Sequence, residues 1–243
     1  MSFASICVTL YLSASTLYAL FSFWRTQDQY PMVTYPAPHF SPEVMWIERR
    51  PKTWVRLNSL PREAWLAIVA AEDGGFFKHN GVEWNQSLRK IRADLRKHRF
   101  PGGISTLNQQ IVKNLYFGAR PAIARKFQEM ILARKMDAAF DKKQILEMYM
   151  NIVEWGPGIV GIGAAARYYF KKPASRLSTR ESVVLANLLP NPRRRGEWVR
   201  HGRLPSSFKR LINQTERRLP GTARIVRTQQ LIAQSQQKRA LLR

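Results

Sequence analysis

The chain begins with 23 residues that carry no charge, from Ser2 to Trp24, although its 243 residues have a formal net charge of +24. As a helix with a rise of about 1.5 Å per residue, this run would be roughly 34 Å long, enough to cross the hydrocarbon core of a bilayer. It has no basic n-region, and no clean small-x-small cleavage site precedes Arg25. An uncleaved anchor over residues 1–24 is therefore favoured over a signal peptide.

The rest of the chain divides by composition. Residues 25–54 contain five prolines among aromatic side chains. This composition predicts an extended connector rather than regular secondary structure. Residues 55–192 have helical periodicity, and no alternating run with hairpin punctuation indicates a strand. Asp141 with Gln144 and Ser178 with Glu181 resemble capping boxes, which predict helices over residues 142–150 and 179–189. We therefore expect a mainly α domain there. Residues 193–243 hold 14 Lys and Arg against two Glu, which predicts a basic helical extension.

The positive charge predicts an anionic partner, because Lys and Arg outnumber Asp and Glu by 40 to 16. Nucleic acid, an anionic membrane surface and a phosphate-bearing substrate all fit. The single cysteine, Cys7, excludes an internal disulfide and a Cys-based metal cluster, and the four histidines show no ligand spacing. No organic cofactor is expected; a Mg²⁺ or Mn²⁺ ion that bridges carboxylates and phosphates is left open.

Glu72 and Asp73 stand at the end of an apolar segment. Residues 60–71 have Pro61 near a helix start and apolar residues at helical spacing, so Glu72 is expected at the C-terminal end of a buried helix. Burial and the partial negative charge of the helix end both make a carboxylate harder to ionise. Glu72 is thus a candidate general acid or base, and the alternative is a Glu-Asp pair that solvates the helix end.

Glu129 is a second carboxylate with an unusual position. The helix predicted between Ala122 and Phe140 places Glu129 on the same face as Leu132 and Met136. One interpretation is an i, i+4 ion pair with Arg125, worth only about 0.2–0.5 kcal/mol. The other is a carboxylate directed into a cleft. The local sequence does not decide between them.

Three blocks in fixed order carry a family resemblance. Residues 72–81 read E-D-x-x-F-x-x-H-x-G, residues 103–114 read G-I-S-T-L-N-Q-Q-I-V-K-N, and the third block combines R-K-x-x-E at 125–129 with further matches at 142–151 and 161–170. Together they resemble the glycosyltransferase domain of the peptidoglycan polymerases, in particular the monofunctional biosynthetic peptidoglycan transglycosylases. Ile104 and Asn108 depart from the second block, which puts the shape of that loop in doubt.

The resemblance implies a lysozyme-like fold and polymerisation of lipid II, a disaccharide-pentapeptide on undecaprenyl pyrophosphate. It implies that Glu72 is the base that deprotonates the acceptor 4-hydroxyl, which attacks the donor with inversion. Glu129 would be the second catalytic carboxylate, near the donor pyrophosphate, and the candidate ligand of a divalent ion. Transfer from a pyrophosphate needs no protonation of the leaving group, so one base and a set of cations suffice.

The same resemblance gives the remaining site residues roles. Pyrophosphate contacts are expected from Lys113, Arg125 and Lys126, and hydrogen bonds to sugar and phosphate from Ser105, Thr106, Gln109 and Gln110. Asp73 and His79 are interpreted as supporting the loop of the first block.

The location and partners also follow from the resemblance. It implies a single-pass protein of the cytoplasmic (inner) membrane, with the catalytic domain on the periplasmic side. The expected partners are lipid II, the nascent glycan strand and anionic lipid, with proteins of cell division or cell-wall synthesis as further candidates.

Two other classes of function compete with this interpretation. A nucleic-acid-binding protein would explain the charge, but the sequence lacks a zinc-finger spacing, an aromatic RNP-type motif and a reason for the apolar start; no nucleic-acid partner is expected. A lysozyme-like hydrolase or lytic transglycosylase would keep the fold, and release of soluble fragments from finished peptidoglycan would identify it.

Overall fold

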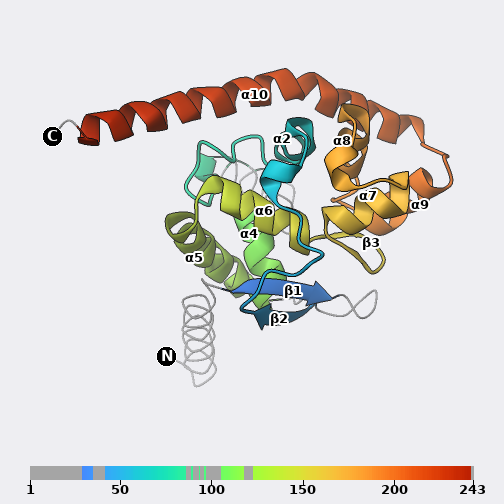
Figure 1. Ribbon diagram of the computed structural model, residues 1–243, viewed down its shortest axis with the longest axis horizontal. Helices are drawn as coiled ribbons and strands as arrows, with labels where there is room; N and C mark the ends of the chain where they lie inside the picture. Colours follow the sequence, from blue (N-terminus) through green and yellow to red (C-terminus); the bar gives the residue numbers. More distant parts are fainter. Residues whose placement is uncertain are drawn as a thin grey trace.

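The computed structural model describes residues 29–34, 42–85, 89, 93, 96, 105–117 and 123–241. The predicted anchor at residues 1–24 and the departing residue Ile104 lie outside this set. Among the helices that are described, none combines the length and the apolar character that a bilayer span requires. The described part of the chain is mainly helical, as predicted, with two short two-stranded sheets (Figure 1).

The first sheet lies within the predicted connector. Strands β1 (Tyr30–Thr34) and β2 (Glu43–Ile47) pair antiparallel, with Tyr30 opposite Ile47. Val33 is buried, and Val44 and Trp46 of β2 pack against the core. The prediction of no regular structure is therefore wrong at these strands. Proline did not prevent them because a two-stranded sheet has only edge strands, where a missing N–H is tolerated.

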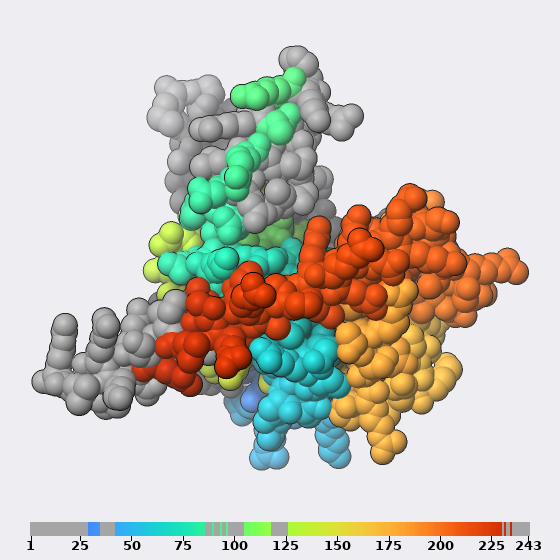
Figure 2. Space-filling model, turned by 90° about the horizontal axis from the view of Figure 1, so that it is seen from above, coloured from blue at the N-terminus to red at the C-terminus, as the bar shows by residue number. Residues whose placement is uncertain are grey.

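Helix α2 (Arg62–Glu72) is at the centre of the domain and follows a short 3₁₀ turn, η1 (Leu57–Ser59). Its apolar side chains are buried against α8 (Thr179–Ala186) and α10 (Ser206–Leu241). Figure 2 shows α10 lying across α2. This packing holds the C-terminal end of α2, and with it Glu72, in a fixed position.

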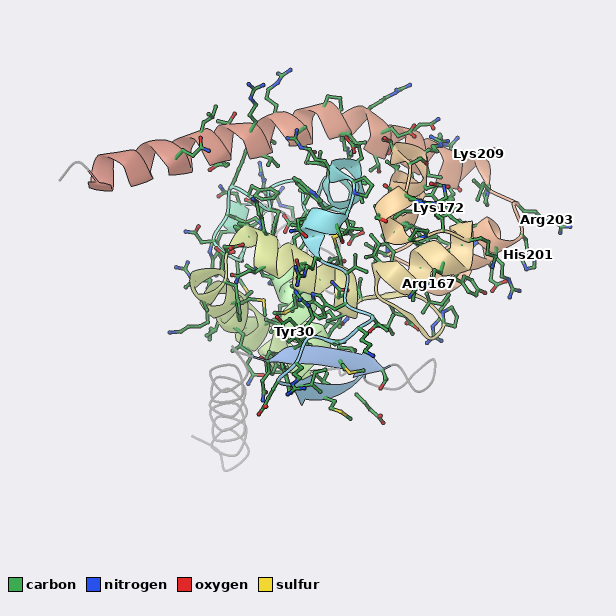
Figure 3. All side chains as sticks on the ribbon, in the orientation of Figure 1. Tyr30, Arg167, Lys172, His201, Arg203 and Lys209 are labelled. Carbon is green, nitrogen blue, oxygen red and sulfur yellow. The ribbon has the colours of Figure 1, made fainter. Side chains whose placement is uncertain are left out.

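Four helical segments form the other side of the domain. Helix α4 (Leu107–Val112) runs into a π-helical turn, η2 (Lys113–Phe117), and packs against α5 (Ile123–Ala139) and α6 (Lys142–Ile152). The capping box predicted at Asp141 opens α6, and the one predicted at Ser178 opens α8. In α8, Glu181 of that box also accepts a hydrogen bond at 2.9 Å from Lys172, which is labelled in Figure 3.

The remaining elements connect α6 to the C-terminal helices. Strands β3 (Glu154–Gly156) and β4 (Ile159–Val160) form a hairpin, followed by α7 (Ile162–Phe170) and the 3₁₀ turn η3 (Ala174–Arg176). Helix α9 (Pro192–Arg200) is capped by Asn191.

The long helix α10 turns one apolar stripe inward. Phe208, Ile212 and Val226 are buried, at the i, i+4 and i+18 spacing of one helix face. The helix continues past α2 beyond the packed part of the domain (Figure 1). The basic residues of the predicted extension are mostly on its outer face, where Lys209, Arg210, Arg217, Arg218, Arg224 and Arg227 are exposed.

Candidate active site

Glu72 is the last residue of α2 and points toward α4. Its Oε2 accepts a hydrogen bond from Gln110 Nε2 at 3.1 Å. The hydroxyl of the buried Tyr149, on α6, donates to Gln110 Oε1 at 2.9 Å. Because a hydroxyl donor fixes the carbonyl end of the amide, the NH₂ group of Gln110 is held toward Glu72. Glu72 is therefore a bonded, half-buried side chain and not a solvated helix end.

Burial raises the pKa of the Glu72 carboxyl above its ordinary value, and the neighbouring charge of Asp73 adds to the rise. The Gln110 hydrogen bond and the charge of Arg195 lower it in part. The direction predicted from the sequence is confirmed, and desolvation is its largest cause. A carboxylate with a raised pKa is a stronger base than an exposed one, which suits proton abstraction near neutral pH.

Asp73 ties the loop after α2 to the start of α4. It is buried and lies within 3.0 Å of His79 Nε2 through both carboxylate oxygens. Its Oδ2 also accepts the N–H of Leu107, the first residue of α4, at 3.0 Å. Asp73 therefore connects His79 to the start of α4, and the loop-supporting role of these two residues stays a prediction.

Thr106 and Gln109 form the capping box of α4 rather than an exposed surface. Thr106 Oγ1 accepts the N–H of Gln109, and Gln109 Oε1 accepts the N–H of Thr106. Thr106 also donates to the carbonyl of Gly81 at 2.6 Å. Both side chains are buried, so their positions favour a structural role over the predicted contact with sugar or phosphate.

Gly81, the last residue of the first block, is required by its surroundings. It has a φ of +83°, and a Cβ there would lie 2.3 Å from the carbonyl oxygen of Ala133 on α5. Only glycine accepts both the left-handed backbone and this close approach. The contact fixes the first loop against α5.

The second carboxylate belongs to a three-residue cluster. Lys126 Nζ donates to Ser105 Oγ at 2.8 Å and lies 3.0 Å from Glu129 Oε2. The Glu129 side chain is only 3% exposed, whereas that of Lys126 is 41% exposed. The ammonium group thus lies between a buried carboxylate and solvent, where an anionic ligand could reach it.

Helix α4 brings the two carboxylate groups into one region. Ser105 lies immediately before Thr106, the N-cap of α4, and Gln110 is the fourth residue of that helix. Gln110 donates a hydrogen bond to Glu72. Ser105 accepts one from Lys126, which also contacts Glu129. The three blocks of the sequence therefore converge on one site.

Three other residues of the second and third blocks have different positions. Lys113 is exposed, one turn beyond Gln110. Arg125 belongs to α5, but its side chain lies outside the described set. Asn108, which departs from the family pattern, is fully buried and donates to Asp137 Oδ1 on α5 at 3.2 Å. Asn108 therefore links α4 to α5.

Two residues of the site were not predicted. Tyr149 lies in a matched block, yet its role as the group that orients Gln110 appears only in the fold. Arg195 of α9 donates to the carbonyl of Asn187 at 2.8 Å, with its guanidinium 5.8 Å from the centre of the Phe208 ring. Burial lowers the pKa of Arg195, and the charge of Glu72 opposes that shift. Nothing distinguishes Arg195 from Arg193 and Arg194 in the sequence.

The described His, Cys, Asp and Glu side chains do not by themselves form a metal centre. Within the described ranges, no three His, Cys, Asp or Glu side chains gather at one point. Glu129 offers carboxylate oxygens, but one of them is already 3.0 Å from Lys126. A hard cation there would need most of its oxygen ligands from elsewhere.

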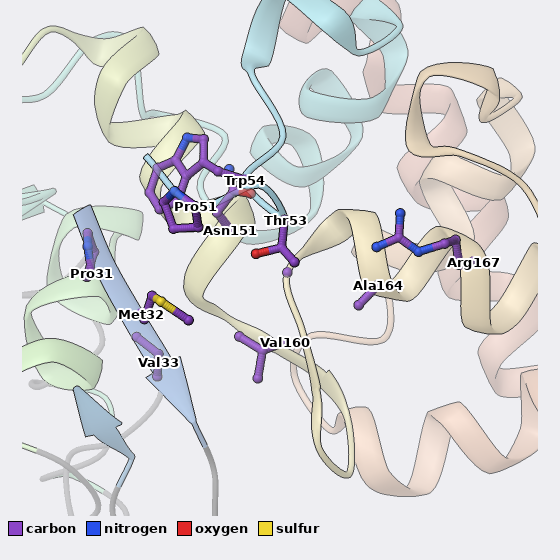
Figure 4. A pocket seen from close by; sticks show the side chains of 11 residues that line it. Pro31, Met32, Val33, Pro51, Thr53, Trp54, Asn151, Val160, Ala164 and Arg167 are labelled. Carbon is purple, nitrogen blue, oxygen red and sulfur yellow. The ribbon is translucent and has the colours of Figure 1, made fainter. Parts of the chain in front are cut away.

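A cavity of about 150 Å³ near the β1–β2 sheet is separate from these carboxylates (Figure 4). β1, Trp54, Asn151 and Arg167 line it. The amide of Asn151 is already bonded to the backbone of Val55, at 2.8 and 2.9 Å. Its lining holds no acid or base for catalysis.

The fold and the site define a mainly helical domain with a carboxylate–cation centre of the kind used for group transfer. A family described as transglycosylase matches residues 42–216, and the chain belongs to this family. The match extends on both sides of residues 55–192, the range of the predicted catalytic domain.

Curated relatives carry the same description. The biosynthetic peptidoglycan transglycosylase of Azoarcus sp. (strain BH72) is 43% identical over 142 residues, which cover 58% of this chain and 62% of the relative. That of Shewanella amazonensis is 43% identical over 162 residues, covering 60% and 64%, and that of Aeromonas hydrophila is 45% identical over 139 residues, covering 57% and 59%. The chain thus aligns with about three fifths of the length of these relatives.

Proposed function

We propose that the protein is a peptidoglycan glycosyltransferase that polymerises lipid II into glycan strands and releases undecaprenyl pyrophosphate. The observation that carries the proposal is the half-buried Glu72, with its raised pKa and its hydrogen bond from Gln110, in a chain of the transglycosylase family. We propose a lysozyme-like arrangement for the catalytic domain.

The reaction needs one base. The Glu72 carboxylate takes the proton from the 4-hydroxyl of the acceptor sugar, and the resulting oxygen attacks the anomeric carbon of the donor. The bond from that carbon to the pyrophosphate oxygen breaks, and its electron pair leaves with undecaprenyl pyrophosphate. Attack opposite the leaving group inverts the anomeric configuration. The proton on Glu72 passes to solvent before the next cycle.

The cations act on the leaving group. Negative charge grows on the pyrophosphate as the bond breaks, and a nearby ammonium stabilises it. Lys126 is suited to this because its Nζ is partly exposed and held by Ser105 and Glu129. We assign Lys113 and Arg125 the same role. Glu129 holds the Lys126 ammonium in position.

A divalent ion, if one takes part, would be shared between Glu129 and the pyrophosphate oxygens. Since the described side chains do not build a complete ligand set, we route no step of the reaction through it. Loss of activity in EDTA, restored by Mg²⁺ or Mn²⁺, would establish the requirement.

We further propose that residues 1–24 anchor the protein in the inner membrane by one span, with the catalytic domain on the periplasmic side. Lipid II stays in the bilayer through its polyprenyl chain, so a tethered enzyme meets it at a high effective concentration. The basic outer face of α10 would attract the anionic membrane surface as a whole, or a partner protein of cell-wall synthesis, without forming a defined site for one lipid.

The experiment that tests the function supplies purified lipid II to the full chain and follows glycan polymer and undecaprenyl pyrophosphate. Polymer formation with stoichiometric release of the pyrophosphate supports the proposal. A parallel incubation with finished peptidoglycan separates the alternative, because soluble fragments in that sample and no polymer from lipid II would identify a lytic enzyme.

A further inference from the structure

A groove of about 540 Å³ lies where the connector, α2 and α6 meet. Its charged lining consists of Arg50 and Arg56 from the connector side, Arg62 from the first turn of α2, and Lys143 and Glu147 from α6; Trp65 forms an aromatic wall. We call this the arginine groove. It is lined by none of the residues assigned to the reaction.

The groove has surplus positive charge. Its three arginines are exposed, and within the described part of the chain neither they nor Lys143 form a side-chain ion pair. The carboxylate of Glu147 is occupied by neutral donors, because it accepts from Trp54 Nε1 and from the N–H of Leu57, both at 2.8 Å. Several unpaired guanidinium groups around one hollow suit a phosphate, which they can bind bidentately.

The groove also lies near the start of the described chain. A neighbouring cavity of about 380 Å³ shares Lys143 and Glu147 with it and is lined by Gln29 and Tyr30. The Tyr30 ring lies edge-on to Trp54, with 5.3 Å between the ring centres.

The predicted anchor ends at Trp24, five residues before Gln29. A chain extends by at most about 3.6 Å per residue, so roughly 18 Å is the longest reach between them. An anchor that spans the bilayer therefore holds these two cavities close to the membrane surface. Tyr and Trp rings beside Arg side chains are typical of that interface.

We propose that the arginine groove binds the phosphate of an anionic phospholipid headgroup and so fixes the orientation of the domain beside its anchor. The inference rests on the membrane attachment proposed above but not on the proposed reaction. A lipid clamped there would limit rotation of the domain about its tether. It would thereby keep the carboxylate site at a constant height above the membrane.

The test uses the full chain in a neutral detergent and measures binding of dihexanoyl-phosphatidylglycerol by isothermal titration calorimetry. Dihexanoyl-phosphatidylcholine and inorganic phosphate are titrated in parallel. Saturable binding of the anionic lipid, with clearly weaker binding of the other two, supports the proposal. Equal binding of the two lipids would overturn it, and equal binding of inorganic phosphate would show a free-anion site instead.

Matched variants localise the binding. The triple variant Arg50→Ala/Arg56→Ala/Arg62→Ala should bind the anionic lipid roughly 10- to 100-fold more weakly, since each basic residue near a membrane contributes substantially. The control, with alanine at Arg217, Arg218 and Arg224, removes the same charge from exposed positions on α10 and should stay within about twofold of the parent. If both triple variants bind the anionic lipid equally weakly, the loss reflects net charge alone and the proposed site is refuted.

Two further measurements separate loss of lipid binding from loss of folding and from loss of substrate binding. Lys143→Gln, a single change in the groove, should weaken lipid binding several-fold and serves as the second variant if the triple variant is unstable. Polymerisation of lipid II in neutral detergent without phospholipid should be unchanged in the triple variant. A large loss there would show that the groove binds the substrate and not the membrane.

Discussion

Replacing Asp73 with alanine tests the scaffold beneath the site. The buried carboxylate accepts from two donors, His79 Nε2 and the N–H of Leu107, at 3.0 Å each. A hydrogen bond to a charged group contributes about 1.5–3 kcal/mol, and the two donors are left buried without a partner. Asp73→Ala should therefore lower the free energy of unfolding by about 3–5 kcal/mol, a large part of the 5–15 kcal/mol typical of a domain.

The assay is urea unfolding of the full chain in neutral detergent, followed by helical circular dichroism. His79→Ala removes only one of the two donors and should cost about half as much. Lipid II polymerisation should fall with the folded population rather than beyond it, because Asp73 is assigned no chemical step. A cost below about 0.5 kcal/mol would refute the scaffold role, and full stability with lost activity would indicate direct chemistry.

Three further predictions concern the charges of the site. Arg195→Gln removes a positive charge that lowers the pKa of Glu72, so the acid limb of the pH–rate profile should move to higher pH; an unshifted limb, or the same shift in Arg194→Gln, would contradict this. The pKa of Glu72 is raised in the folded state, so the folded state holds that proton more tightly than the unfolded state does. Stability therefore falls as the pH rises from the ordinary carboxyl pKa to the folded-state pKa. Glu72→Gln should therefore raise Tm at pH 7.5, with the gain disappearing below the ordinary carboxyl pKa of 4.5; a lower Tm at pH 7.5 would argue that Glu72 is not desolvated. Lys126→Gln should lower the polymerisation rate by about 100-fold or more while Lys135→Gln, on the exposed side of α5, leaves it unchanged; parity between the two variants would remove Lys126 from the site.

The sequence predicted those parts of the fold that depend on local patterns. The apolar spacing before Glu72 places the end of α2 correctly, and the capping boxes at Asp141 and Ser178 locate the starts of α6 and α8. These signals work because a helix end needs a specific donor or acceptor within three residues. The β1–β2 sheet was missed because its pairing is set by packing on the core, and proline-rich sequence hides edge strands.

The candidate site was only partly predictable. The motifs contain both proposed carboxylates, but they cannot distinguish a residue that contacts substrate from one that supports the backbone around it. For Thr106 and Gln109 the fold adds that their side chains close the cap of α4, which the motif does not reveal. Arg195 could not be recognised, because the packing of α9 on β3 and the bond to Asn187 determine which of three successive arginines acts electrostatically on Glu72.

The role of Glu72 as the base is tested by comparing Glu72→Gln with Glu63→Gln on purified lipid II. Both changes remove one carboxylate from α2, and only the first touches the proposed base. We predict that Glu63→Gln polymerises at close to the parent rate and that Glu72→Gln is slower by at least about two orders of magnitude, the usual contribution of a general base. Near-normal polymerisation by Glu72→Gln would contradict this role.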